Sequence, residues 1–125
     1  MTLFLLTLVW GVTAAAYNHN GSLLVYGGEE GKLGLADLHR GELLASWQAH
    51  QPPVSCLLLT QDETAVWSLG RDGGLVRSSL LRLGERLWAG GLGLPPPHGL
   101  APRMALAPDG EHILASTEAG GVVYR

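Results

Sequence analysis

The chain has 125 residues, of which 46% are hydrophobic and 15% are charged, and its formal net charge is −3 at pH 7. This length is typical of one domain, and the apolar content excludes a disordered tail. Acidic and basic residues are interspersed, without the basic stripe that is typical of a nucleic-acid-binding surface. We therefore expect a folded domain that does not bind nucleic acid.

The N-terminal stretch "MTLFLLTLVWG" is strongly apolar. A helix that spans a membrane needs about 20 such residues, so we expect no direct membrane span. A signal peptide within residues 1–16 is an alternative, because Ala14-Ala15-Ala16 could supply a cleavage site. However, no Lys or Arg precedes the apolar run, and cleavage would remove the start of a repeat. We interpret residues 1–11 as an apolar leader that is not repeat-like and that forms a strand.

From Val12 onward the sequence reads as four short strands separated by turns. The run "VTAAAY" predicts a buried inner strand, and "NHNG" supplies Asn and Gly for a turn. "SLLVYGG" predicts a second strand, and "EEGK" predicts a tight hairpin in which Gly31 takes a positive φ. The third strand, a turn and the fourth strand follow as "LGLADL", "HRGE" and "LLASWQA". No segment keeps a helical period, and "SSLLRLGERLWAGG", which comes nearest, is interrupted by Gly84.

The same pattern returns with a fixed spacing. Val12 and Val54 lie 42 residues apart, as do Gly28 and Gly70. The fourth strand of this second copy is weaker, around residues 85–89. A third copy, "RMALAPDGEHILASTEAGGVVYR", follows the connection "GLGLPPPHGLAP" and stops after its third strand. Periods of about 40–45 residues with four short strands each are typical of β-propeller blades.

Glycine, tryptophan and cysteine add three expectations. Paired glycines suit tight turns, and the pairs are Gly27-Gly28, Gly73-Gly74, Gly90-Gly91 and Gly120-Gly121. Most of the tryptophans are expected to pack between blades; they are Trp10, Trp47, Trp67 and Trp88. The single cysteine, Cys56, cannot form an internal disulfide and is expected to be a small core residue.

Polar residues at recurring places of the repeat resemble those of the WD-repeat β-propeller family. In that family each repeat carries Gly-His near its start, an Asp between the second and third strands, and Trp-Asp near the end of the third strand. Here Ala49-His50 stands in the Gly-His place and Asp72-Gly73 supplies the turn Asp. Ala36-Asp37 stands in the Trp-Asp place without the Trp, and Ser68 falls where the family has a second-strand hydroxyl.

The resemblance implies a structural hydrogen-bond set of His50, Ser68 and Asp72. A His in the loop before a blade can bond the turn Asp, so that buried polar groups satisfy one another. A catalytic dyad of His50 and Asp72 is the alternative, although the fold already explains their spacing. We expect no enzyme activity, no cofactor and no metal, since the histidines are scattered and "GGEEGK" lacks the spacing of a phosphate loop.

The fold class that follows is all-β: a partial WD-repeat β-propeller of about two to three four-stranded antiparallel blades. It is not closed, because a closed propeller has about 4–8 blades. The expected division is a leader (1–11), repeat one (12–50), repeat two (51–91), a Pro/Gly-rich connection (92–101) and an incomplete repeat three (102–125).

An open propeller leaves blade faces uncovered, which favours self-association. We expect some of the apolar strand residues on those wet faces; the set is Leu23, Val25, Leu33, Leu35, Val54, Leu57, Leu59 and Val66. The leader could pair with an open edge as the missing fourth strand of the third blade. The stretch "GLPPPHG" is interpreted as a stiff linker, with a polyproline ligand as the alternative.

The stretches "YNHNGSLLV", "SWQAH", "ETAVWSLGRDG" and "GGVVYR" are similar to the C-terminal propeller of one endosomal member of the family. This resemblance implies a non-catalytic protein-interaction scaffold on the cytosolic face of early and late endosomes. Its implied role is early-to-late endosome maturation, with a late-endosomal Rab GTPase and lipid-kinase complex components as partners. The alternative is a truncated product with no independent function, or one that interferes with the full-length protein.

Overall fold

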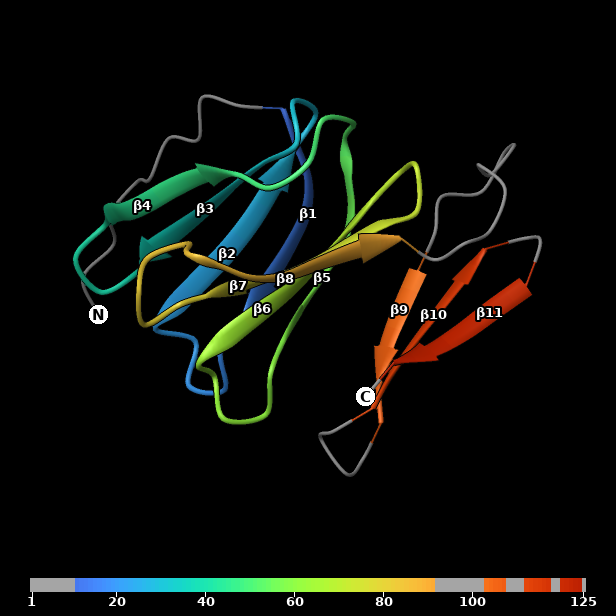
Figure 1. The fold of residues 1–125 in the computed structure, drawn as a ribbon. Helices are drawn as coiled ribbons and strands as arrows, with labels where there is room; N and C mark the ends of the chain where they lie inside the picture. Colours follow the sequence, from blue (N-terminus) through green and yellow to red (C-terminus); the bar gives the residue numbers. More distant parts are fainter. Residues whose placement is uncertain (1–10, 92–102, 108–111, 118–119, 125) are drawn as a thin grey trace.

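The computed structural model describes residues 11–91, 103–107, 112–117 and 120–124, drawn in colour in Figure 1. In these ranges the chain forms eleven strands and no helix. The strands are β1 (Val12–Tyr17), β2 (Leu23–Gly28), β3 (Lys32–Asp37), β4 (Glu42–Gln48), β5 (Val54–Leu59), β6 (Ala65–Gly70), β7 (Gly74–Ser79), β8 (Arg86–Gly91), β9 (Arg103–Leu106), β10 (Ile113–Thr117) and β11 (Gly120–Tyr124).

The strands form three antiparallel sheets that follow one another along the chain. Their orders are β1-β2-β3-β4, β5-β6-β7-β8 and β11-β10-β9, so every sheet is a simple meander. The second sheet lies between the other two, and the three do not close into a ring (Figure 1). The predicted fold class, an all-β partial propeller, is therefore confirmed.

The β2–β3 hairpin forms where the sequence places it, because Gly31 supplies the backbone geometry that the turn needs. Gly31 has φ of 80°, in the left-handed region that favours glycine. A side chain at this position would also collide with the backbone carbonyl of His50. The carbonyl oxygen of Gly31 accepts the N–H groups of Ala49 and His50, at 3.1 and 3.0 Å. The turn thereby holds the segment that leads from the first sheet into the second.

The prediction that the paired glycines form tight turns is wrong for three of the four pairs. Gly27-Gly28 and Gly90-Gly91 end strands, and Gly120-Gly121 begins one, whereas Gly73 does lie in a turn, with φ of 88°. The physical reason is close packing at Gly27. A Cβ there would lie 2.7 Å from the Cβ of Val54, so this glycine lets β2 approach β5.

The fourth strand of the second sheet is stronger than predicted. β8 is a regular strand that pairs with β7 from Gly74↔Gly91 to Ser78↔Arg86, although all six of its residues are exposed. Its side chains therefore carry no burial pattern that could reveal it. Backbone hydrogen bonding to β7 holds it, as expected for an outer strand with one neighbour.

Two hydrophobic cores lie between the sheets. The first joins sheets one and two, and the second joins sheets two and three, where Trp67, Leu69, Leu75 and Ile113 are buried. The prediction that some of the apolar strand set lies on wet faces is wrong, because all eight residues belong to the first core. Six of them are buried (Val25, Leu33, Leu35, Val54, Leu57 and Val66) and two are partly buried against it (Leu23 and Leu59). Half of the set belongs to sheet one and half to sheet two, so each sheet covers the face of the other on which these side chains lie.

The tryptophans and the cysteine pack much as predicted. Trp67 is buried in the second core, and its ring meets that of Trp88 edge-on at 5.8 Å between centroids. Trp47 packs against the first core and donates its indole N–H to Ser78 Oγ at 3.2 Å. Cys56 is partly buried against the second core. Trp10, the leader up to residue 10 and the stretch "GLPPPHG" lie outside the described residues.

Candidate functional site

His50 and Ser68 form a buried pair between the first and second sheets. His50 follows β4, and Ser68 lies in the middle of β6 with no exposed surface. The imidazole Nε2 lies 2.8 Å from Ser68 Oγ, and the hydroxyl donates to the carbonyl of Val76 at 3.3 Å. Either atom can donate in the short contact, because the donor and acceptor roles depend on which ring nitrogen of His50 carries the proton.

Asp72 reaches the same place from the β6–β7 turn. Its Oδ1 accepts the backbone N–H of Gly74 at 2.9 Å, which fixes the turn. A Cβ built on Gly70 would lie 2.9 Å both from this oxygen and from His50 Nδ1, so the two side chains meet over Gly70. The structure thus brings together the three residues that the sequence analysis singled out, with the hydrogen bond of His50 made to Ser68.

The electrostatics of this set keep His50 neutral near pH 7. Burial lowers the pKa of His50 below its ordinary value of 6.5, and the charge of Arg86 adds to the lowering. The charge of Asp72 and a hydrogen bond to the backbone of Ser68 act in the opposite direction and raise the pKa, but burial is the largest cause. His50 is only 7% exposed. The geometry suits a pin between blades better than a base that must reach a substrate.

The degenerate Trp-Asp position lies elsewhere in the first sheet. Ala36 is fully buried in β3, and Asp37 ends that strand. Asp37 Oδ1 accepts the backbone N–H groups of His39 and Arg40, at 3.0 and 3.1 Å. It therefore caps the β3–β4 turn, at the opposite end of β3 from Gly31 and the His50 set.

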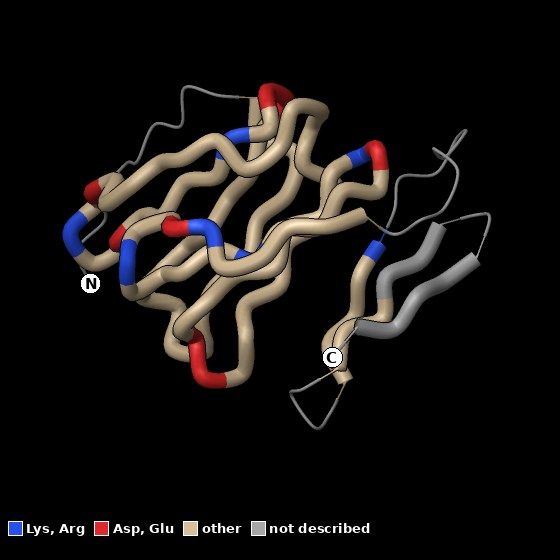
Figure 2. The backbone as a smooth tube through the Cα atoms, in the orientation of Figure 1, with Lys and Arg blue, Asp and Glu red and all other residues tan. Residues whose placement is uncertain are grey.

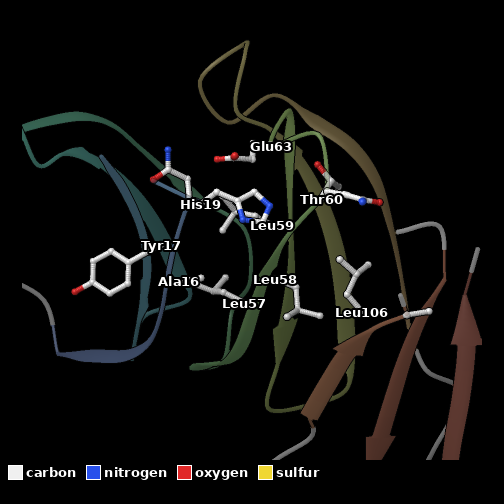
Figure 3. A pocket seen from close by; sticks show the side chains of 12 residues that line it. Ala16, Tyr17, His19, Leu57, Leu58, Leu59, Thr60, Glu63 and Leu106 are labelled. Atoms are coloured by element: carbon white, nitrogen blue, oxygen red, sulfur yellow. The ribbon is translucent and has the colours of Figure 1, made fainter. Parts of the chain in front are cut away.

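A second candidate site, which sequence reasoning missed, is a hollow of about 540 Å³ where the inner strands of the three sheets end. Its lining comes from residues 16–19 at the end of β1, residues 57–61 and 63 around the end of β5, and residues 106–107 at the end of β9. Figure 3 shows Leu57, Leu58 and Leu59 beside Ala16 on one side and Leu106 on the other. Only the repeat spacing could have signalled this site, because equivalent strand ends meet in a stack of blades.

In the described ranges no three His, Cys, Asp or Glu side chains gather in a group that could hold a metal ion. Likewise, the part of the chain that the structure describes has no helix long and apolar enough to cross a membrane.

Comparison with known proteins agrees with the architecture. A family model described as the anaphase-promoting complex subunit 4 WD40 domain matches residues 9–62. Together with the repeated antiparallel sheets, this match makes the chain similar to proteins of one defined class, the WD-repeat β-propeller family. Domains of this class generally mediate protein–protein interactions and are generally not enzymes.

Within the family the chain is similar to WD repeat-containing protein 91. It is 30% identical to the protein from Danio rerio and 31% identical to that from Bos taurus, in both cases over 91% of the chain. A homolog from Dictyostelium discoideum is 30% identical over 59% of the chain. The chain spans only 18% and 17% of the length of the fish and bovine proteins.

Proposed function

We propose that the chain is a non-catalytic interaction scaffold that acts in early-to-late endosome maturation, on the cytosolic face of endosomes. Its partners are a late-endosomal Rab GTPase and components of a lipid-kinase complex. The observation that carries this proposal is the similarity to WD repeat-containing protein 91 across 91% of the chain. The Rab and lipid-kinase partners are those that the resemblance in the sequence analysis implies.

The surface of the molecule supports a binding role. The outer strands β4 and β8 expose large apolar side chains; those of Leu43, Leu44, Leu87 and Trp88 are 40–49% exposed. Exposed aromatic and aliphatic side chains on regular strands are suited to contact a folded partner. These same side chains are consistent with the predicted self-association, which remains a prediction.

We also propose that His50, Ser68 and Asp72 serve this scaffold as structural residues, and that the repeats divide at 12–50, 51–91 and 102–125. The burial of His50 and its bond to Ser68 support the first point. The sheets β1–β4, β5–β8 and β9–β11 support the second, since each lies within one of these ranges.

The test is capture of the Rab GTPase by the purified chain. A late-endosomal Rab loaded with a non-hydrolysable GTP analogue is immobilised beside the same protein loaded with GDP. We expect the chain to bind the GTP form in preference, because an effector reads the switch segments that the γ-phosphate orders. A folded chain that binds neither form would contradict the proposal.

A second function rests on a specific observation, the short span of the chain relative to its relatives. In this second proposal, a chain that spans 18% of the length of its relative either has no activity of its own or competes with the full-length protein for partners. Adding the chain to a complex of the full-length relative and the Rab separates the cases. Displacement of the relative supports interference, and no displacement together with no binding supports an inactive product.

A further inference from the structure

The hollow at the ends of the inner strands combines an apolar floor with a polar rim. The floor consists of aliphatic side chains from three sheets, including Ala16 from β1, Leu58 from β5 and Leu106 from β9. Leu58 and Leu106 are only partly covered by the second core, so they present surface to the hollow. His19 and Glu63 stand at its rim in Figure 3. A floor of this kind suits aliphatic side chains of a ligand.

The charge of the hollow is one-sided. Glu63 is the one acidic residue in its lining, which contains neither Lys nor Arg. The neighbouring Asp62 is already engaged, since its Oδ1 accepts from Thr60 Oγ1 at 2.7 Å and from Thr64 Oγ1 at 2.8 Å. Among the described residues no ion pair involves the Glu63 carboxylate. The ion pair that these residues do form joins Arg82 and Glu85, before β8. Figure 2 shows the acidic β5–β6 turn as a red segment.

Glu63 also occupies a backbone position that normally suits glycine. Its φ is 61°, and the equivalent residue 42 positions earlier is Gly21, with φ of 71°. At Gly21 a Cβ would meet open space, so only the backbone conformation favours glycine there. A side chain in the left-handed region costs stability. The second repeat thus places a carboxylate at the rim of the hollow where the first repeat has a glycine.

We propose that this hollow binds an extended peptide segment of a partner protein in which a Lys or Arg adjoins aliphatic residues. The Glu63 carboxylate pairs with the cation, and the floor around Leu58 takes the aliphatic side chains. Charge complementarity selects this ligand, because an acidic peptide would bring its carboxylates against Glu63 with neither Lys nor Arg in the lining to pair with them. The inference rests on the proposed scaffold function, to which it adds the chemistry of the partner.

The test uses the full 125-residue chain and a phage-displayed library of random peptides, followed by titration of the enriched peptide. The expected peptides contain Lys or Arg beside Leu, Ile or Val. Glu63→Gly should weaken their binding by about fivefold, the effect of one charged contact at a rim. The same substitution should raise Tm by about 2–6 °C, because glycine relieves the backbone cost at this position.

A matched control is available at Leu83, which also has a positive φ, of 51°, but lies outside the lining. Leu83→Gly should raise Tm in the same way and leave peptide binding unchanged. Glu63→Lys should abolish binding of basic peptides, whereas Glu63→Gln should reduce it about as much as Glu63→Gly. Higher stability with weaker binding in Glu63→Gly is a result that a merely structural role cannot produce.

Three outcomes would overturn the inference. They are enrichment of no peptide, enrichment of acidic peptides, and peptide binding that Glu63→Gly leaves unchanged. Failure here is distinct from failure of the proposed function. If the chain still captures the Rab but its Glu63 variants bind every peptide as the parent does, peptide binding by the hollow is disproved and the scaffold function is not.

Discussion

Removal of the Ser68 hydroxyl should show how much the buried pair with His50 stabilises the blade. In Ser68→Ala the Cβ remains, so packing in β6 is kept, while the partner of His50 Nε2 at 2.8 Å is lost. His50 is 7% exposed, so water cannot readily replace the hydroxyl. A buried donor or acceptor left without a partner costs about 1–3 kcal/mol. The longer bond from Ser68 to Val76, at 3.3 Å, adds little.

We therefore expect the free energy of unfolding to fall by about 2 kcal/mol in Ser68→Ala. The assay is urea denaturation followed by tryptophan fluorescence at neutral pH, with a double-mutant cycle that includes His50→Leu. The coupling energy of the two changes should exceed about 1 kcal/mol. The matched control is Ser46→Ala in β4, an exposed serine, which should change stability by less than about 0.5 kcal/mol.

A loss of stability in Ser68→Ala below about 0.5 kcal/mol, combined with an additive double-mutant cycle, would contradict this prediction. That result would mean that His50 gains nothing from the hydroxyl despite its short contact. A large loss of stability without coupling energy between Ser68 and His50 would instead mean that the substitution disturbs β6 itself. The pair of Ser68 and His50 would then not be what stabilises the blade.

Two further predictions concern the same interface between sheets. The chain should lose stability as pH falls from about 7.5 to 5.5. The reason is that the pKa of His50 is lowered in the folded state, so the unfolded chain, in which the pKa of His50 is about 6.5, takes up a proton at a higher pH than the folded chain does. Above the unfolded-state pKa of 6.5, neutral His50 contributes its full share to the free energy of unfolding. His50→Gln should therefore make the free energy of unfolding, measured by denaturation, vary less with pH. A variant with the same pH dependence as the parent would contradict this prediction. Gly27→Ala should destabilise the chain by about 1–3 kcal/mol, since the new Cβ would lie 2.7 Å from the Cβ of Val54. A thermal melt checks this, and a variant as stable as the parent would show that β2 and β5 separate easily.

Local sequence pattern was sufficient for most of the strands. The apolar run "VTAAAY" coincides with β1, although the predicted burial of this strand is wrong, because four of its six residues are exposed. Gly31 has the positive φ that its hairpin requires, because turn chemistry acts within a few residues. β8 was underestimated for a related reason. Its side chains are all exposed, and the backbone pairing that holds it to β7 leaves little trace in the composition.

Of the two candidate sites, the sequence predicted one and not the other. The family spacing placed His50, Ser68 and Asp72 near one another, and the structure shows which atoms meet. The sequence does not predict the hollow beside Glu63, because its lining comes from segments about 40–50 residues apart, and contacts between such segments leave no local sequence pattern. The strain at Glu63 could have been suspected, since the repeat aligns this residue with Gly21.

Neighbouring residues and their spacing were enough to predict the alternation of strands and turns, the repeat length and the family resemblance. Which face of each strand is covered depends instead on how the sheets pack against one another. Val25 and Leu35 lie in a core because sheet two packs over them, and Gly27 sits in a strand because Val54 comes close. Alternation along a strand shows which side chains share a face, whereas the neighbour that covers the face is set by the stacking of whole sheets.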